Sequence, residues 1–149
     1  MRMMETSIDI DAPAERVFEI LTDLEGYERE GWNEYIRSFT GALEPGTVLR
    51  AAVRQVSGKE IRLKVRVVSG SYPELRWEKK APIPGVVHAE HWFRVDPLGP
   101  ARCRFVQGEH ITGALTFAVF HLVERSRQGF ERFNAALKRR AEQGLPPTL

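Results

Sequence analysis

His91 and Glu109 are the two side chains whose types and placement could perform acid–base chemistry. His91 shares one face of an alternating run over residues 87–95 with apolar side chains, and that face should point inward. If Phe93 faces Phe105 on the next strand, Glu109 stands diagonal to His91, roughly 7–8 Å away between backbones. A carboxylate beside an imidazole in an apolar chamber can supply a general acid or base. The alternative is a satisfied pair that only anchors two strands.

Other chemistry is weakly supported by the sequence. The run His88-Ala89-Glu90-His91 has the composition of a metal-binding motif, but on a strand residues 88 and 91 point to opposite faces. We therefore expect no metal site. Glycine-rich phosphate loops and nucleophile-elbow motifs are missing from the sequence, so we also expect no cofactor. Cys103 lacks an evident basic partner and is interpreted as a small core residue.

Strands with a period of two should position these side chains. The clearest alternation covers residues 61–67, and similar runs cover 4–10, 49–53, 75–77 and 87–95, with a last strand starting at Cys103. A tight turn is expected at 96–100. Because the connections are short, consecutive strands should pair as an antiparallel meander. After the first strand, a helix should begin at 11–13 and end at Glu25-Gly26, followed by an irregular aromatic segment over 27–35 that could hold a second helical turn.

The C-terminal part predicts one long amphipathic helix from about Leu115 to Glu142. At 1.5 Å per residue it is ~40 Å long, whereas a strand of eight residues reaches only ~27 Å. The helix should therefore cross the whole concave side of the sheet. Ser126 and Gly129 interrupt its apolar stripe, and our hypothesis is that this notch leaves space for a ligand. The alternative is a kink, or a close approach to a bulky strand residue such as Trp77.

Length, composition and charge fit one ordinary domain. The chain has 149 residues, 42% hydrophobic and 28% charged, with a net charge of +2 that gives no reason to expect a nucleic-acid partner. One cysteine and the lack of a secretory pattern favour a cytoplasmic location. The uncharged stretch 111–123 is well short of the ~20 residues needed to span a bilayer, so no membrane insertion is expected. We expect one domain over 1–143, a short tail over 144–149, and a monomer or homodimer.

The order of these elements and several local motifs resemble the START-like, or SRPBCC, superfamily. The segment 10–18, Ile-Asp-Ala-Pro-Ala-Glu-Arg-Val-Phe, is similar to the family's opening pattern, and 22–27 with 32–36 is similar to its next conserved pattern. Here Arg29-Glu30-Gly31 replaces a shorter link, and Glu34 stands where proline is usual. The segments 91–93, 104–113 and 130–138 also resemble bacterial members.

The resemblance implies an α+β helix-grip fold: a curved antiparallel sheet of about seven strands around a long C-terminal helix, with two short helices after the first strand and an internal cavity. The residues expected to line that cavity are Trp32, Tyr35, Leu63, Val65, Trp77, His91, Phe93, Phe105, Glu109, Val119, Val123, Ser126 and Phe130. Trp32 and Tyr35 could instead only close the small helices onto the sheet.

Three functions remain open at this point. The first is binding, and possibly transport, of a small hydrophobic molecule such as a lipid or a polyketide-like compound. The second is an enzyme of the cyclase, aromatase or dehydratase kind, with His91 and Glu109 as acid and base. The third is a protein-interaction module. The binding function needs only the cavity, and we prefer it because the sequence carries few catalytic constellations.

Overall fold

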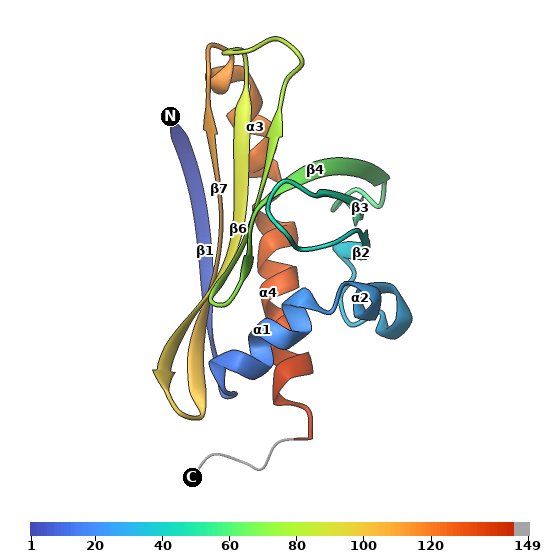
Figure 1. Ribbon diagram of the computed structural model, residues 1–149, viewed down its shortest axis with the longest axis vertical. Coiled ribbons are helices and arrows are strands. Elements are labelled where there is room, and N and C mark those ends of the chain that lie inside the picture. Colours follow the sequence, from blue (N-terminus) through green and yellow to red (C-terminus); the bar gives the residue numbers. More distant parts are fainter. Residues whose placement is uncertain (145–149) are drawn as a thin grey trace.

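Seven antiparallel strands form one sheet in the computed structural model, which describes residues 1–144 (Figure 1). The sheet order is β1-β7-β6-β5-β4-β3-β2, so every sequential pair except β1 and β2 is adjacent. The predicted tail falls outside the described residues apart from Gly144. The strands are β1 (Arg2–Ile10), β2 (Ile36–Thr40), β3 (Val48–Arg54), β4 (Glu60–Ser71), β5 (Glu74–Lys80), β6 (His88–Gly99) and β7 (Arg102–Thr112).

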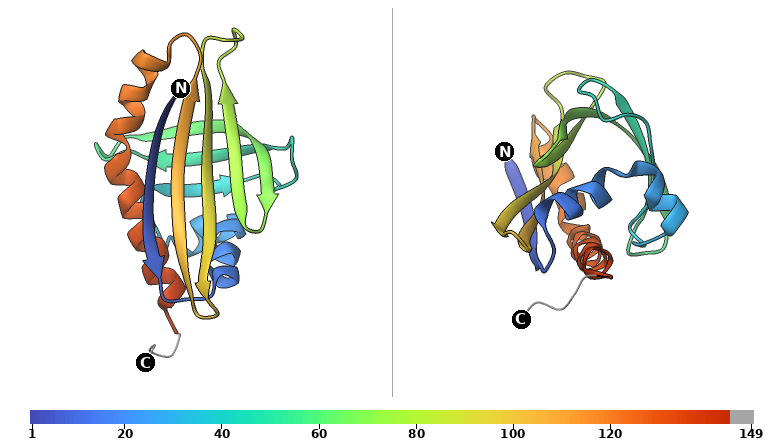
Figure 2. Two further views of the ribbon diagram at one scale, coloured as in Figure 1. Left: turned by 90° about the vertical axis from the view of Figure 1, so that its left-hand side faces the viewer. Right: turned by 60° about the horizontal axis from the view of Figure 1, so that its bottom comes forward.

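The sheet curls into a half-barrel whose open side is occupied by the C-terminal helix, as the two views of Figure 2 show. The helices in the described part of the chain are α1 (Ala14–Thr22), α2 (Leu24–Glu30), α3 (Thr116–Arg125) and α4 (Arg127–Glu142). Two short helices after the first strand and a long helix at the C-terminus confirm the predicted α+β helix-grip architecture.

The first helical segment is divided at Asp23, and the prediction that it ends at Glu25-Gly26 is wrong. The Asp23 side chain accepts a hydrogen bond from the backbone N–H of Gly26 at 3.3 Å and starts α2 as its N-cap. Arg29, six residues further along the chain, forms an ion pair with Asp23 at 2.8 Å. A local side-chain cap therefore turns the expected end of one helix into the beginning of another.

The β6–β7 hairpin has a different register from the expected one. The predicted pairing of Phe93 with Phe105 is wrong, because Phe93 faces Gln107 and Val95 faces Phe105. The reason is the turn: β6 continues through the expected turn residues to Gly99, with an irregularity between Pro97 and Gly99, and the chain reverses at 100–101. This shift of two residues brings His91 directly opposite Glu109.

The expected single helix over 115–142 consists of two segments that meet at Ser126. The Ser126 hydroxyl donates to the carbonyl of Leu122 at 3.3 Å, and its backbone N–H bonds to Val123 rather than continuing the α-helical ladder. Side-chain bonding of this kind bends helices. The C-terminal end at Glu142 agrees with the prediction, and the kink was among the weighed alternatives for the Ser126–Gly129 notch.

The centre of the core lies between α4 and the inner face of the sheet. Phe133 on α4 is fully buried, and its ring stacks on Phe93 at 5.0 Å and lies 6.1 Å from Phe105. On the helical side it contacts Trp32, with ring centroids 5.2 Å apart. These aromatic rings are closely packed and leave no room for a ligand between them. Space for a ligand therefore lies further along the sheet, toward α3.

Candidate functional site

A cavity of about 300 Å³ lies between the inner face of the sheet and the α3–α4 junction. Its walls are mostly aliphatic and aromatic, and its exposed rim includes Gln55, Lys79 and Leu122. A larger hollow of about 520 Å³ on the outer side of β2–β4 is lined mainly by polar and charged groups. The inner cavity has the apolar character of small-molecule sites. Its lining residues are Tyr35, Ile36, Val53, Gln55, Ile61, Leu63, Val65, Trp77, Lys79, Ala89, His91, Glu109, Leu122, Val123, Ser126 and Phe130.

Most of the residues predicted to line a cavity do so. The structure brings nine of them together: Tyr35, Leu63, Val65, Trp77, His91, Glu109, Val123, Ser126 and Phe130. Four others lie elsewhere: Trp32, Phe93, Phe105 and Val119. The first three pack around Phe133 in the solid core, and Val119 packs with the cluster of Met4 and Ile111.

His91 is held in the cavity wall by aromatic rings. Its imidazole stacks on Trp77, with ring centroids 4.6 Å apart and planes within 6° of parallel, and it meets the edge of Phe130 at 5.0 Å. His91 is 8% exposed. Across the strands, its Nδ1 lies 3.8 Å from Oε2 of Glu109. The two groups are therefore closer than the diagonal arrangement expected from the sequence, and both line the cavity.

A chain of buried polar groups leads away from His91 on the side opposite the cavity. Nε2 of His91 lies 2.9 Å from Oε1 of Gln107. The Gln107 amide nitrogen donates to Oδ1 of Asn134 at 2.9 Å and to the carbonyl of Phe130 at 3.4 Å. The Asn134 amide nitrogen then donates to the Thr6 hydroxyl at 2.9 Å. This relay of Gln107, Asn134 and Thr6 joins β7, α4 and β1 inside the core.

Sequence reasoning missed the relay, although it carried a weak signal. Gln107 has the same strand parity as Cys103 and Phe105, and Asn134 sits beside Phe130 and Phe133 on α4. The inner face of β7 and the apolar face of α4 must both be buried, and buried amides are expected to be hydrogen-bonded. The simplest partners for Gln107 and Asn134 are therefore each other. The exposed rim residues of the cavity were also missed, because nothing local distinguishes them from ordinary surface positions.

Tyr35 contributes a neutral hydroxyl to the site. Burial raises the pKa of Tyr35 to about 12, the nearby carboxylate of Glu109 adds to this effect, and the Ser126 hydroxyl offsets part of it. The phenol therefore stays protonated over the physiological range. Its ring also fills the space above Gly129, where an added Cβ would lie 2.7 Å from Cε2 of Tyr35. Ser126 therefore borders the cavity, whereas Gly129 lies against the Tyr35 ring and borders a separate hollow of about 100 Å³.

Cys103, on β7, is fully buried in the hydrophobic core. Burial, with smaller contributions from Glu15 and Asp9, raises the pKa of its thiol to about 11. The thiol form is therefore the stable one near neutral pH, and a thiolate nucleophile is disfavoured. This environment agrees with a core residue.

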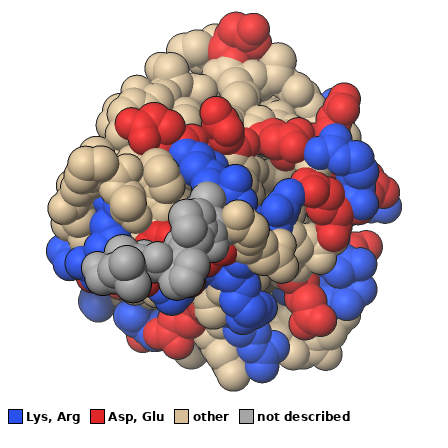
Figure 3. Space-filling view, turned by 90° about the horizontal axis from the view of Figure 1, so that it is seen from below, with Lys and Arg blue, Asp and Glu red and all other residues tan. Residues whose placement is uncertain are grey.

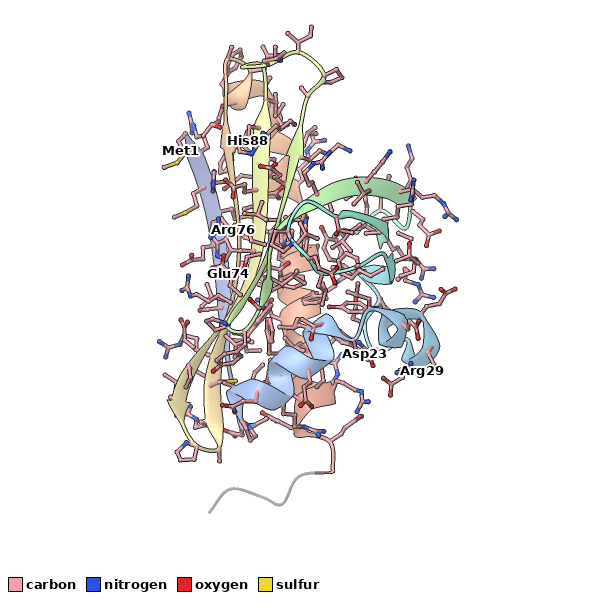
Figure 4. The ribbon with its side chains drawn as sticks, in the orientation of Figure 1. Met1, Asp23, Arg29, Glu74, Arg76 and His88 are labelled. Atoms are coloured by element: carbon pink, nitrogen blue, oxygen red, sulfur yellow. The ribbon has the colours of Figure 1, made fainter. Side chains whose placement is uncertain are left out.

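The outer face of β5 and β6 carries ion pairs. Arg76 pairs with Glu74 at 2.6 Å, and both side chains are labelled in Figure 4. Arg76 also packs over the ring of Trp92, 4.7 Å from its centroid, and His88 Nε2 lies 2.9 Å from Oε2 of Glu78. His88 and His91 thus point to opposite sides of β6, as expected for a strand. Within residues 1–144, three or more His, Cys, Asp or Glu side chains do not gather in a way that could hold a metal ion.

Charges of both signs are interspersed over the end of the molecule seen from below (Figure 3). Arg104 bonds Asp9 at 2.7 Å, and Arg140 bonds Glu30 at 2.6 Å. Many of the arginines are thus paired locally with carboxylates. Among the helices of the described residues, none is both long and apolar enough to cross a membrane.

Residues 1–142 match the family model described as polyketide cyclase / dehydrase and lipid transport. The chain belongs to this family. A comparison with curated protein sequences finds no match.

Similar solved structures confirm the fold. A START superfamily protein from Mycobacterium smegmatis aligns with a TM-score of 0.72 and 20% identity, over 95% of this chain and 97% of that chain. The Zhui aromatase/cyclase from Streptomyces sp. R1128 aligns with a TM-score of 0.73 and 20% identity, over 95% and 94%. Norcoclaurine synthase from Thalictrum flavum, in complex with dopamine and hydroxybenzaldehyde, aligns with a TM-score of 0.65 and 11% identity, over 98% and 89%. At these identities the likeness establishes the fold alone.

Proposed function

We propose that the protein binds a small hydrophobic molecule, of lipid or polyketide-like character, in the cavity beside the α3–α4 junction. The observation that carries this proposal is the cavity itself, about 300 Å³ with mostly apolar walls and a few convergent polar groups. Sites for small molecules commonly have this composition and a volume of roughly 300–1,000 Å³. A volume at the lower end of that range favours a compact ring system over a long acyl chain.

Native mass spectrometry of protein purified gently from its own host tests this function. We expect a small molecule to travel with the wild-type chain. The variant Ser126→Phe places a ring into the cavity from the α3–α4 junction and should lose that molecule. Gln128→Phe adds the same ring at an exposed position nearby and should retain it. A wild-type chain that carries no molecule and gains no thermal stability from lipids or polyketides would argue against the proposal.

The pairing of His91 with Glu109 favours a second candidate, an enzyme of the cyclase, aromatase or dehydratase kind. The two groups stand 3.8 Å apart on the cavity wall, and Trp77 offers a flat surface beside them. The likeness to an aromatase/cyclase supports this candidate without establishing it. Turnover would show as a change in the mass of the bound molecule and as a bell-shaped pH profile that His91→Ala abolishes. A molecule that is released unchanged favours binding alone.

The domain bounds, the oligomeric state, the lack of a nucleic-acid partner and the cellular location stay predictions. We propose one domain over 1–143, a monomer or homodimer, no nucleic-acid partner and a cytoplasmic location. Sedimentation analysis of the full chain measures the oligomeric state, and a binding titration with duplex DNA at low salt tests the expected lack of affinity.

A further inference from the structure

The relay behind His91 determines where its proton sits. The Gln107 amide nitrogen faces two acceptors, the backbone carbonyl of Phe130 and Oδ1 of Asn134. A carbonyl oxygen only accepts, so the Gln107 atom beside it must be the nitrogen, and the Gln107 oxygen must face His91. That oxygen carries no proton. The hydrogen bond of 2.9 Å between it and Nε2 of His91 therefore requires the proton on Nε2.

The far end of the relay supports the same direction. The Thr6 hydroxyl donates to the backbone carbonyl of Gln107 at 3.4 Å and so must accept from Asn134. Asn134 then presents its oxygen to Gln107, as the observed contact requires. Two backbone carbonyls thus fix the order of donors and acceptors from Thr6 to His91, and every member is buried.

A neutral His91 with its proton on Nε2 shows a lone pair to the cavity at Nδ1. The nearest charged atom is Oε2 of Glu109 at 3.8 Å, which is also an acceptor and lies beyond hydrogen-bonding distance. At this point the wall therefore offers two acceptors side by side with no proton between them. While His91 is neutral, a donor group on a bound molecule supplies the proton that these two acceptors lack.

We propose that this cavity selects ligands that carry a hydroxyl or amino group on a flat apolar body, and that Gln107 is the positioning residue that enforces the choice. The inference rests on the proposed ligand-binding function and deepens it. Trp77, stacked on His91, provides the flat surface, and the donor group of the ligand lies against Nδ1 of His91 and the carboxylate of Glu109. A ligand with an ether or methyl in place of the donor leaves both acceptors desolvated and unpaired.

Nitrogen-15 NMR of the free protein tests the position of the proton, at a pH at which the imidazole is neutral. We expect a pyrrole-type signal with an attached proton at Nε2 and a pyridine-type signal at Nδ1. In Gln107→Leu the best remaining acceptor is Glu109, so the proton should move to Nδ1. If the proton of His91 in the wild type is found on Nδ1, the inference is overturned. It is also overturned if the Gln107→Leu chain folds and the proton of His91 stays on Nε2.

Three matched probes test the selection: β-naphthol, β-naphthylamine and β-naphthyl methyl ether, each titrated into the full chain. A hydrogen bond to a charged acceptor is worth about 1.5–3 kcal/mol, so the two donors should bind the wild type at least ~10-fold more tightly than the ether. Gln107→Leu should lose this preference while still binding the ether. Equal affinities in the wild type overturn the inference and leave the binding function standing. No binding of any probe overturns both.

Discussion

Tyr35 connects the packing of α4 to the chemistry of the cavity. Its ring lies against Gly129 and meets Phe130 with centroids 5.9 Å apart, while its hydroxyl end lies near Ser126 and Glu109. A glycine in a helix costs about 1 kcal/mol relative to alanine. Glycine is nevertheless suited to this position, because α4 must leave room for the Tyr35 ring.

Gly129→Ala should therefore destabilise the protein, although alanine is the better helix former. The new Cβ would lie 2.7 Å from the Tyr35 ring, and overpacking typically costs about 1–3 kcal/mol. We expect a net loss of about 1 kcal/mol in urea unfolding. Gln128→Ala, at an exposed neighbouring position, should be neutral or slightly stabilising. In a Tyr35→Leu background the penalty of Gly129→Ala should disappear, and a penalty that persists would contradict this account.

Cys103 should be almost inert in the folded protein. Its pKa is raised from 9.0 to about 11, so at about pH 8 the thiolate fraction is about a hundredfold lower than in the unfolded chain. Burial slows the reaction further. A chromogenic disulfide reagent should react slowly with native protein and rapidly in guanidinium. Similar rates in both conditions would show that the site is open.

At the scale of elements, Asp23 separates α1 from α2 by capping rather than by charge. Asp23→Ala removes the acceptor for the Gly26 N–H and should cost about 1 kcal/mol. Asp23→Asn keeps the acceptor and loses only the ion pair with Arg29, whose two side chains are 57% and 47% exposed. Exposed pairs contribute little. Thermal melts should thus place the asparagine variant close to wild type, and equal losses in both variants would favour the ion pair.

The elements show what could be predicted from the sequence and what could not. Strands were predictable because alternation has a period of two, and α4 because its stripe continues to Glu142. The β6–β7 register could not be predicted, because it depends on where the hairpin turns. The expected turn residues continue β6 instead. The relay could not be predicted either, because its contacts join residues as far apart in the sequence as Thr6 and Asn134. The two amides are visible in the sequence, but their pairing is a property of the assembled core.

At the scale of the whole molecule, Glu142 joins the end of α4 to the link between β1 and α1. It accepts from the backbone N–H of Asp11 at 2.8 Å and from Lys138 at 2.6 Å, and Lys138 also donates to the carbonyl of Asp9. Burial alone would raise the pKa of Glu142, but the hydrogen bonds from Lys138 and Asp11 outweigh it and lower the pKa below 4.5.

Glu142→Gln should therefore destabilise the protein in a pH-dependent way. A carboxyl with a lowered folded-state pKa contributes stability above its unfolded value, and that contribution disappears as the pH falls through the folded value. We expect the difference in unfolding free energy from wild type to be largest near neutral pH and to narrow below about pH 4.5. Glu131→Gln, exposed on the same helix, is the matched control and should show no such trend.

The kink at Ser126 divides the C-terminal helix into parts with unequal anchoring. α3 buries only Thr116 and Val123, whereas α4 buries seven residues. Phe117 and Leu122 on α3 are 72% and 57% exposed. Segments with few buried contacts open locally at a small fraction of the global unfolding free energy. Amides of α3 should exchange with deuterium well before those of α4.

α3 carries Leu122 and Val123 of the cavity wall, so its weaker anchoring affects the rates at which a ligand enters and leaves. A bound molecule can leave when α3 opens, while α4, the relay and the sheet stay folded. Residence time would then be set by the opening rate of one short helix, and affinity by the cavity behind it. Changes on the exposed side of α3 should alter how fast a ligand enters and leaves while hardly altering how tightly it is held.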